Sequence, residues 1–117
     1  MPRLDVYVDY KRFLSFKLGL GSLRVGRSPD CDLQLPSEEV SRHHSTIAPT
    51  EDGGFAIEDL STNGTRVNAT MIHGRKALVP GDRIYIATYV LVYQEDNTPP
   101  ETLESEETLV LDDTRLM

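Results

Sequence analysis

Apolar and polar residues alternate over short stretches through most of this 117-residue chain. The period of two, with many β-branched and aromatic residues, predicts a series of short strands. No stretch of ten or more residues has a clean helical period. Strands that follow one another without helices form a sandwich or a barrel, so we expect an all-β protein. The predicted strands are Arg3–Val8, Phe13–Leu18, Leu23–Gly26, Ser45–Ala48, Phe55–Asp59, Arg83–Ala87 and Tyr89–Tyr93.

The alternation stops near Asp96, where the composition also changes. Residues 97–117 contain six acidic residues and one arginine, whereas the preceding 96 residues are close to neutral within a total net charge of −7. An acidic segment without aromatic residues cannot bury enough apolar surface to offset its chain entropy. We therefore predict one domain over residues 1–96 and an acidic, disordered tail over residues 97–117.

The composition also restricts partners and compartment. A nearly neutral body with an acidic tail argues against nucleic acid as a partner, because backbone phosphates require a basic face. A single cysteine, Cys31, excludes an internal disulfide and suits a reducing compartment. No signal peptide and no apolar run of membrane-spanning length is visible. The sequence therefore predicts a cytoplasmic protein that binds neither nucleic acid nor membrane.

Small, polar and cationic residues gather where predicted strands end. Arg27 follows Gly26 at the end of one strand, Ser41 and Arg42 precede another, and Asn63 lies in a turn after a third. Arginine suits bidentate phosphate contact, and a side-chain amide can pair with the N–H and C=O of an extended peptide. Each feature considered alone has an ordinary explanation: Arg27 as a surface arginine, and the Asn-Gly pair as a hairpin turn. Together they suit recognition of a phosphate and its peptide.

The histidines do not indicate a metal site. His43 and His44 are adjacent, so in a strand they face opposite sides, and His73 lies in a different turn. With Cys31 as the one cysteine, the ligand set of a zinc site is incomplete. We predict no metal and no cofactor, and we interpret His44 as a hydrogen-bonding residue that braces its loop.

Enzyme motifs are incomplete as well. The glycine-bearing stretch Lys17–Gly26 lacks the third glycine of a dinucleotide loop and the lysine of a P-loop. Ser41, His44 and Asp59 offer the residue types of a hydrolase triad. However, Ser41 and His44 are too close in sequence, and no Gly-x-Ser-x-Gly turn is present. We therefore predict that the protein is not an enzyme, with a small hydrolase as the alternative.

The order of the motifs resembles the forkhead-associated (FHA) domain. The chain runs from Gly-Arg through Ser-Arg-x-His to Asn-Gly and a further asparagine, and Pro-Gly-Asp precedes the last strands. The resemblance covers roughly Leu4–Gln94. It implies a β-sandwich of two twisted sheets with recognition loops at one end, in a small, bacterial-type, single-domain protein that binds phosphothreonine.

The resemblance also implies a role for each matching residue. Arg27, Ser41 and Thr62 would contact the phosphate. Arg42 would reach the phosphate or the peptide residue three positions after the phosphothreonine, and Asn63 would hold the peptide backbone. The residues that would shape and brace the loops are Gly26, His44, Gly64 and Asn68.

The expected function is a phosphothreonine-dependent adaptor in Ser/Thr kinase signalling. The tail adds an in-built candidate ligand, because it carries Thr102 and Thr108. Thr108 is preferred as the phosphorylation site, since acidic residues precede it and Leu111 follows at plus three. The phosphorylated tail would bind its own domain, as in some bacterial members of the family, or another copy. The alternatives are a tail of merely solvating charge and a scaffold that binds partners without phosphate.

Overall fold

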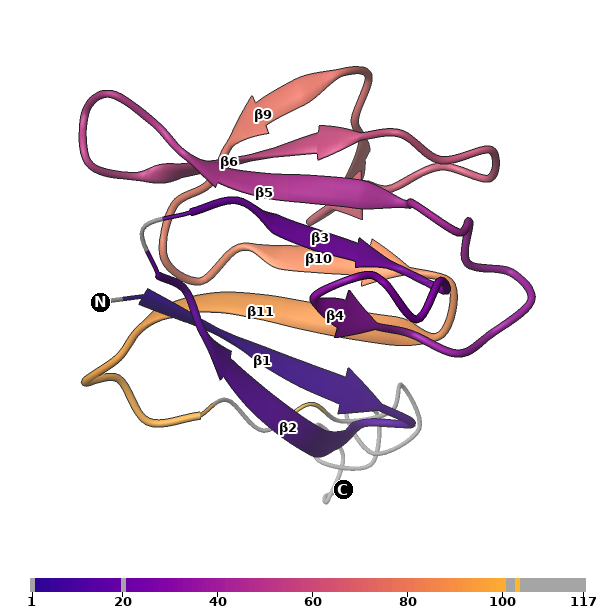
Figure 1. Ribbon diagram of the computed structural model, residues 1–117. Coiled ribbons are helices and arrows are strands. Elements are labelled where there is room, and N and C mark those ends of the chain that lie inside the picture. The colour runs from indigo at the N-terminus through magenta and orange to yellow at the C-terminus, as the bar shows by residue number, and fades with distance from the viewer. Residues whose placement is uncertain (1, 20, 101–102, 104–117) are drawn as a thin grey trace.

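The computed structural model describes residues 2–19, 21–100 and 103. These residues form eleven strands, which Figure 1 shows in two layers. The strands are β1 (Pro2–Val8), β2 (Lys11–Lys17), β3 (Leu23–Gly26), β4 (Leu33–Gln34), β5 (Ser45–Pro49), β6 (Phe55–Asp59), β7 (Arg66–Val67), β8 (Thr70–Met71), β9 (Arg75–Ala77), β10 (Arg83–Ile86) and β11 (Tyr89–Glu95).

The strands form a β-sandwich of two sheets. One sheet has six strands in the order β2-β1-β11-β10-β7-β8, and the other has five in the order β4-β3-β5-β6-β9. β3 and β4 pair in parallel, and the other recorded pairings, such as β1 with β11 and β5 with β6, are antiparallel. The predicted all-β sandwich is confirmed.

The core lies between the sheets and follows from the alternation. Val6, Val25, Ile47, Ile84 and Leu91 are completely buried, and each comes from a different strand. Side chains one position along a strand point to the opposite face. Apolar residues two positions apart therefore fill the interior and bring the two sheets together.

Several short strands lie outside the predicted set. β4, β7, β8 and β9 have only two or three residues each, which is too short for a periodic signal. β2 begins at Lys11 instead of Phe13, and its register with β1 shifts between Val6 and Tyr7. These differences arise because pairing with a neighbouring strand, and not local periodicity, defines such elements.

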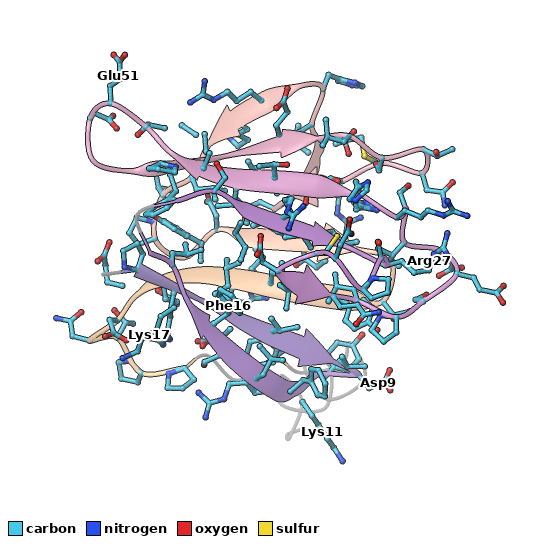
Figure 2. The ribbon with its side chains drawn as sticks, viewed as in Figure 1. Asp9, Lys11, Phe16, Lys17, Arg27 and Glu51 are labelled. Atoms are coloured by element: carbon cyan, nitrogen blue, oxygen red, sulfur yellow. The ribbon has the colours of Figure 1, made fainter. Side chains whose placement is uncertain are left out.

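Three connections converge at one end of the sandwich. The β3–β4 turn, the β4–β5 loop and the β6–β7 loop all lie at the right in Figure 1, and Arg27 lies at this end in Figure 2. The opposite end carries the β5–β6 turn with Glu51. The described ranges contain no helix long and apolar enough to cross a membrane.

Residues placed in the tail by the sequence analysis touch the sandwich. The carbonyl oxygen of Thr98 accepts a hydrogen bond from Arg3. Leu103 is only 7% exposed, in a cluster with Tyr7 and Val92. Thr102 and Thr108, the candidate phosphorylation sites, lie outside the described residues.

Candidate functional site

Gly26 allows the β4–β5 loop to lie directly against the end of β3. A Cβ at this position would be 2.1 Å from the carbonyl oxygen of Arg42, so no other residue fits without a backbone shift. This close approach lets the backbone N–H of Arg27 donate to the carbonyl of Ser41 at 2.9 Å, and that of Ser28 donate to the carbonyl of Arg42 at 3.2 Å. The glycine thereby sets Arg27 beside Ser41.

The Arg27 side chain is positioned by one hydrogen bond and is otherwise exposed. Its Nε donates to the carbonyl of Val40 at 2.9 Å. A guanidinium has five N–H donors, so this bond orients the group and leaves the Nη donors for an anion. The arrangement suits bidentate contact with a phosphate.

Ser41 and Thr62 connect two of the loops. The backbone N–H of Thr62 donates to the Ser41 hydroxyl at 3.1 Å. A serine hydroxyl can accept and donate at the same time, so the Ser41 proton remains able to bind an anion. The side chain of Thr62 is exposed at the same place. The structure thus brings Arg27, Ser41 and Thr62 together from three connections.

His44 is completely buried and joins the β4–β5 loop to the β6–β7 loop. Its Nδ1 accepts from the Ser41 backbone N–H at 3.1 Å, and its Nε2 faces the carbonyl of Gly64 at 2.9 Å. These partners require a neutral ring with the proton on Nε2. Burial lowers the pKa of His44 below its ordinary value, against the raising influence of the Gly64 carbonyl and Asp59. The neutral ring is therefore the stable form.

Asp59 organises the β6–β7 loop, a role that the sequence analysis did not assign. Its Oδ1 accepts hydrogen bonds from the hydroxyl groups of Ser61 and Thr65, at 2.6 and 2.8 Å, and from the Ser61 backbone N–H. Burial alone would raise the pKa of Asp59, but the bonds from Ser61 and Thr65 bring it below its ordinary value. The Asp-x-Ser spacing at the start of the loop is typical of an Asx turn and was the available signal.

Asn63 and Gly64 lie at the tip of this loop. The Asn63 Nδ2 donates to the carbonyl of Glu39 at 3.1 Å, which leaves the amide oxygen and the second N–H for a peptide. Gly64 has a φ of 103°, and a Cβ there would be 2.8 Å from the Met71 sulfur. A pocket of about 360 Å³ opens beside them, lined by Glu39, His44, Asn63, Gly64 and Ala87.

Arg42 and Asn68, two further predicted site residues, have different surroundings from Arg27, Ser41 and Asn63. The Arg42 side chain is exposed, while its carbonyl oxygen accepts from the loop that follows β3. Asn68 turns the chain between β7 and β8 with a φ of 56°. Its amide bonds Asp82 at 3.0 Å and the backbone N–H of Arg83 at 3.0 Å. Asn68 thus braces the start of β10 and has no recorded bond to the loops that carry Arg27, Ser41 and Asn63 among the described residues.

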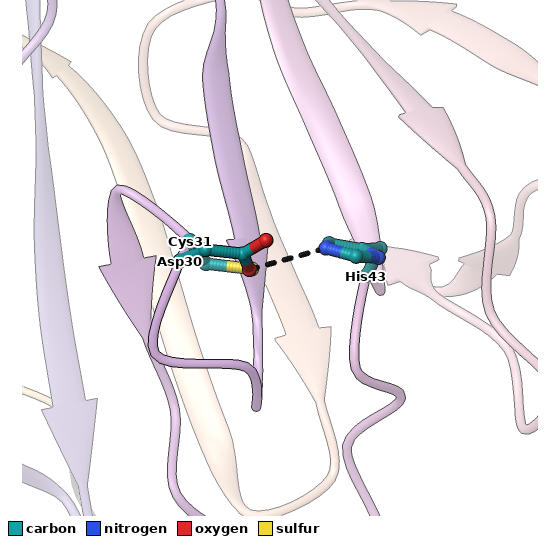
Figure 3. A group of neighbouring side chains, drawn as sticks. All are labelled: Asp30, Cys31 and His43. Carbon is teal, nitrogen blue, oxygen red and sulfur yellow. Dashed lines mark hydrogen bonds and ion pairs between the residues drawn. The ribbon is translucent and has the colours of Figure 1, made fainter.

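Asp30, Cys31 and His43 bring three potential metal ligands together, a grouping that the sequence analysis did not foresee. Figure 3 shows them between the β3–β4 turn and the segment before β5, with their ligand atoms within 4.8 Å of one another. His43 Nε2 pairs with the Asp30 carboxylate at 3.2 Å, and the Cys31 thiol donates to the Arg42 carbonyl at 3.2 Å. Burial raises the pKa of Cys31, which disfavours the thiolate that a metal requires. The cluster is accounted for as a tie between two loops.

The geometry also bears on the alternative of a hydrolase. Both ring nitrogens of His44 are engaged by backbone groups, so neither is available to take the proton of the Ser41 hydroxyl. The Asp59 carboxylate bonds Ser61 and Thr65 and has no recorded hydrogen bond to the ring within the described residues. The three side chains therefore do not form a catalytic triad.

A β-sandwich with cationic, hydroxyl and amide side chains gathered on loops at one end is typical of a recognition module. The chain matches the family model of the FHA domain over residues 23–87. It therefore belongs to the FHA domain family and is a non-catalytic binding module. The resemblance found in the sequence is confirmed.

Curated relatives are much longer proteins. The chain is 35% identical over 82 residues to the ABC transporter ATP-binding/permease protein Rv1747 of Mycobacterium tuberculosis, covering 70% of this chain and 9% of that protein. It is 36% identical over 80 residues to the transcriptional regulatory protein EmbR of the same species, covering 68% of this chain and 20% of EmbR. The chain thus spans a fifth or less of the length of these relatives.

Solved structures of FHA domains superpose over most of the chain. The FhaA FHA domain, in a complex with the intracellular domain of Rv3910, has a TM-score of 0.71 and 29% identity. The match covers 80% of this chain and all of that one. A domain from a study of phosphothreonine-dependent FHA interactions has a TM-score of 0.67 and 29% identity, covering 85% of this chain and 99% of the other.

Proposed function

We propose that this domain binds phosphothreonine-containing segments of proteins through its three clustered loops. The observation that carries the proposal is the hydrogen-bonded assembly of Arg27, Ser41 and the 62–64 turn around the neutral, buried His44. The donors are held in place before a ligand arrives, so binding requires little ordering of the protein. Phosphothreonine-dependent interaction of a structural relative supports the choice of ligand.

The residues divide the recognition among them. Arg27 donates from its Nη groups to the phosphate, and Ser41 donates from its hydroxyl, with Thr62 adjacent. Asn63 pairs with the backbone of the bound segment, and this pairing fixes the register of the peptide. Arg42, exposed beside Ser41, contacts the phosphate or the residue at plus three, where it favours an acidic side chain.

A domain of this kind acts as an adaptor for a Ser/Thr kinase in the cytoplasm. Its ligands are phosphorylated partner proteins and its own tail once Thr108 or Thr102 carries a phosphate. A tethered ligand has an effective concentration on the order of millimolar, so even a modest affinity would leave the site occupied. Phosphorylation of the tail would then compete with partners.

Binding of phosphothreonine peptides to the full chain tests the main proposal. A fluorescent peptide is titrated in phosphorylated and unphosphorylated forms, followed by anisotropy. We expect binding of the phosphorylated form alone, and a loss of about 10- to 100-fold in Arg27→Ala, because charge-assisted hydrogen bonds contribute about 1.5–3 kcal/mol.

Arg24→Ala is the matched control, since Arg24 is an exposed arginine on β3, three positions before Arg27, and pairs with Asp32 at 3.5 Å. It should bind as the unaltered chain does. Binding that ignores the phosphate, or equal losses in both variants, would favour the scaffold alternative, in which a sheet face contacts partners.

A further inference from the structure

The outer face of the six-stranded sheet carries a second apolar cluster. Tyr7 of β1 and Val92 of β11 are buried there together with Leu103, and Val90 packs at the margin. Leu103 comes eight residues after the end of β11. The chain therefore reverses after β11 and returns across the outer face of the sheet that it has just completed.

Arg3 holds this reversal in place. Its Nη1 donates to the carbonyls of Glu95 and Asp96, at 2.7 and 2.9 Å, and its Nη2 donates to the carbonyl of Thr98. Asp5 is completely buried and binds the guanidinium at 2.9 and 3.0 Å. A buried ion pair thus orients the segment that leads to Leu103.

A pocket lies beside Val90, at the margin of this cluster. It has a volume of about 330 Å³ and is lined by Tyr10, Arg66, Tyr85, Ala87 and Val90, with Asp9 and Thr88. Val90 also packs in the cluster of Leu103, so the pocket adjoins that cluster. Ala87 also lines the pocket beside His44 and Asn63. The outer face and the recognition loops are therefore connected through Ala87.

Arg66, one of the residues that line the pocket, provides a positive charge suited to an acidic segment. The Arg66 guanidinium lies 4.3 Å from the centre of the Tyr85 ring. Stacking over an aromatic face leaves guanidinium N–H groups able to bind a carboxylate. The residues that directly follow Leu103 are Glu104, Ser105, Glu106 and Glu107.

We propose that residues 104–107 dock in this pocket, with a glutamate on Arg66, and lead Thr108 to the recognition loops of the same molecule. Thr108 lies five positions after Leu103, and an extended chain over five positions spans at most about 17 Å. Thr102 precedes Leu103 in the chain and Thr108 follows the docked residues, so Thr108 is the in-built ligand of this proposal. The docking step is independent of phosphate, while the use of Thr108 rests on the proposed function.

A spin label tests the docking step in the unphosphorylated protein. Ser105→Cys is labelled with a nitroxide in a Cys31→Ser background, and NMR amide signals are recorded. We expect selective broadening at Tyr85, Thr88 and Val90. The broadening should disappear in Arg66→Glu and persist in Arg75→Glu, an exposed arginine on β9 of the other sheet. Broadening spread evenly over the surface would overturn the proposal.

Mixing separates this proposal from exchange between molecules. Labelled protein without ¹⁵N is combined with ¹⁵N protein that lacks the nitroxide. Broadening in this sample would show that the segment docks on a second copy, which would overturn docking within one molecule. Unbroadened signals support it.

The phosphorylated protein tests the delivery of Thr108. With Thr108 phosphorylated, an added phosphothreonine peptide should bind about tenfold more tightly to Arg66→Glu than to the parent chain, because the tail competes less well. Equal affinities would refute delivery by this route. Without tail phosphorylation both chains should bind the peptide equally, so a failure of phosphothreonine binding itself would be seen separately.

Discussion

Two arginines at opposite places in the sandwich show how surroundings decide the role of a side chain. Arg3 is 6% exposed, and its donors are taken up by Asp5 and by three backbone carbonyls. The Arg27 side chain is exposed and has one recorded hydrogen bond, to the carbonyl of Val40, among the described residues. A guanidinium with its donors saturated holds the protein together, whereas one with free donors can bind an anion.

The two arginines also differ in whether a carboxylate neutralises their charge. Near Arg3, burial would raise the pKa of Asp5, but hydrogen bonds from Arg3 and Ser15 hold that pKa below its ordinary value. Near Arg27, the backbone carbonyl of Val40 orients the side chain without neutralising its charge. The comparison predicts that substitutions at Arg3 affect stability and those at Arg27 affect binding.

The largest effect is expected from Arg3→Met. This change leaves the Asp5 carboxylate buried without its partner, so the free energy of unfolding should fall by about 3 kcal/mol or more. Urea denaturation measures the loss. Arg24→Met, at an exposed ion pair, is the control and should change stability by less than about 1 kcal/mol. A loss at Arg3 no larger than that at Arg24 would contradict the distinction.

Arg27→Lys should produce the opposite pattern. Lysine keeps the charge but lacks the fork that binds two phosphate oxygens, so affinity for a phosphothreonine peptide should fall about tenfold. Stability should change by no more than about 1 kcal/mol, since one hydrogen bond to Val40 is lost. Calorimetric titration and urea denaturation of the same sample give both values, and a large loss of stability with intact binding would refute the assignment.

Leu103→Ala tests whether the chain reversal contributes to the fold. Leu103 covers Tyr7 and Val92 on a sheet face, and losing its buried methyl groups should lower the free energy of unfolding by about 1–2 kcal/mol. Val79→Ala is the control, because Val79 is 59% exposed and should be nearly neutral. Equal midpoints of thermal unfolding for the two variants would mean that Leu103 adds nothing to stability.

The smallest effect concerns pH and the loop that His44 braces. The pKa of His44 is lowered in the folded protein, whereas in the unfolded chain it is about 6.5. As the pH falls below 6.5, the unfolded chain binds a proton that the folded protein does not, so stability decreases. We expect a loss of up to about 1 kcal/mol between pH 7 and 5.5, measured by urea denaturation. His73→Gln, at an exposed turn, should show the same loss.

The sequence predicted the strands well where local periodicity is strong. The long strands were predicted close to their observed bounds, because alternation reports which face of a strand is buried. The same rule failed for Arg3 and Asp5, which alternate like solvent-facing residues but are buried. Their burial depends on the segment that follows β11, and no local pattern encodes that contact.

Some residues of the candidate site could likewise be predicted from the sequence, and others could not. The Gly-Arg, Ser-Arg-x-His and Asn-Gly motifs were visible because each uses residue types suited to a turn or an anion. Asp59 was considered only as a member of a triad, although it accepts bonds from Ser61 and Thr65. The shared pocket at Ala87 could not be foreseen either, since alanine has no chemistry that marks a site.

By itself, the sequence determined the all-β class, the principal strands and the residue types suited to phosphate, because these depend on local period and side-chain chemistry. Only the tertiary structure decided which arginine is saturated and which is free, and where the chain runs after β11. Those properties depend on partners distant in sequence: Arg3 meets Glu95 to Thr98 across the sheet, and His44 meets Gly64 between loops. Hydrogen bonds and burial of this kind exist only when the strands have assembled.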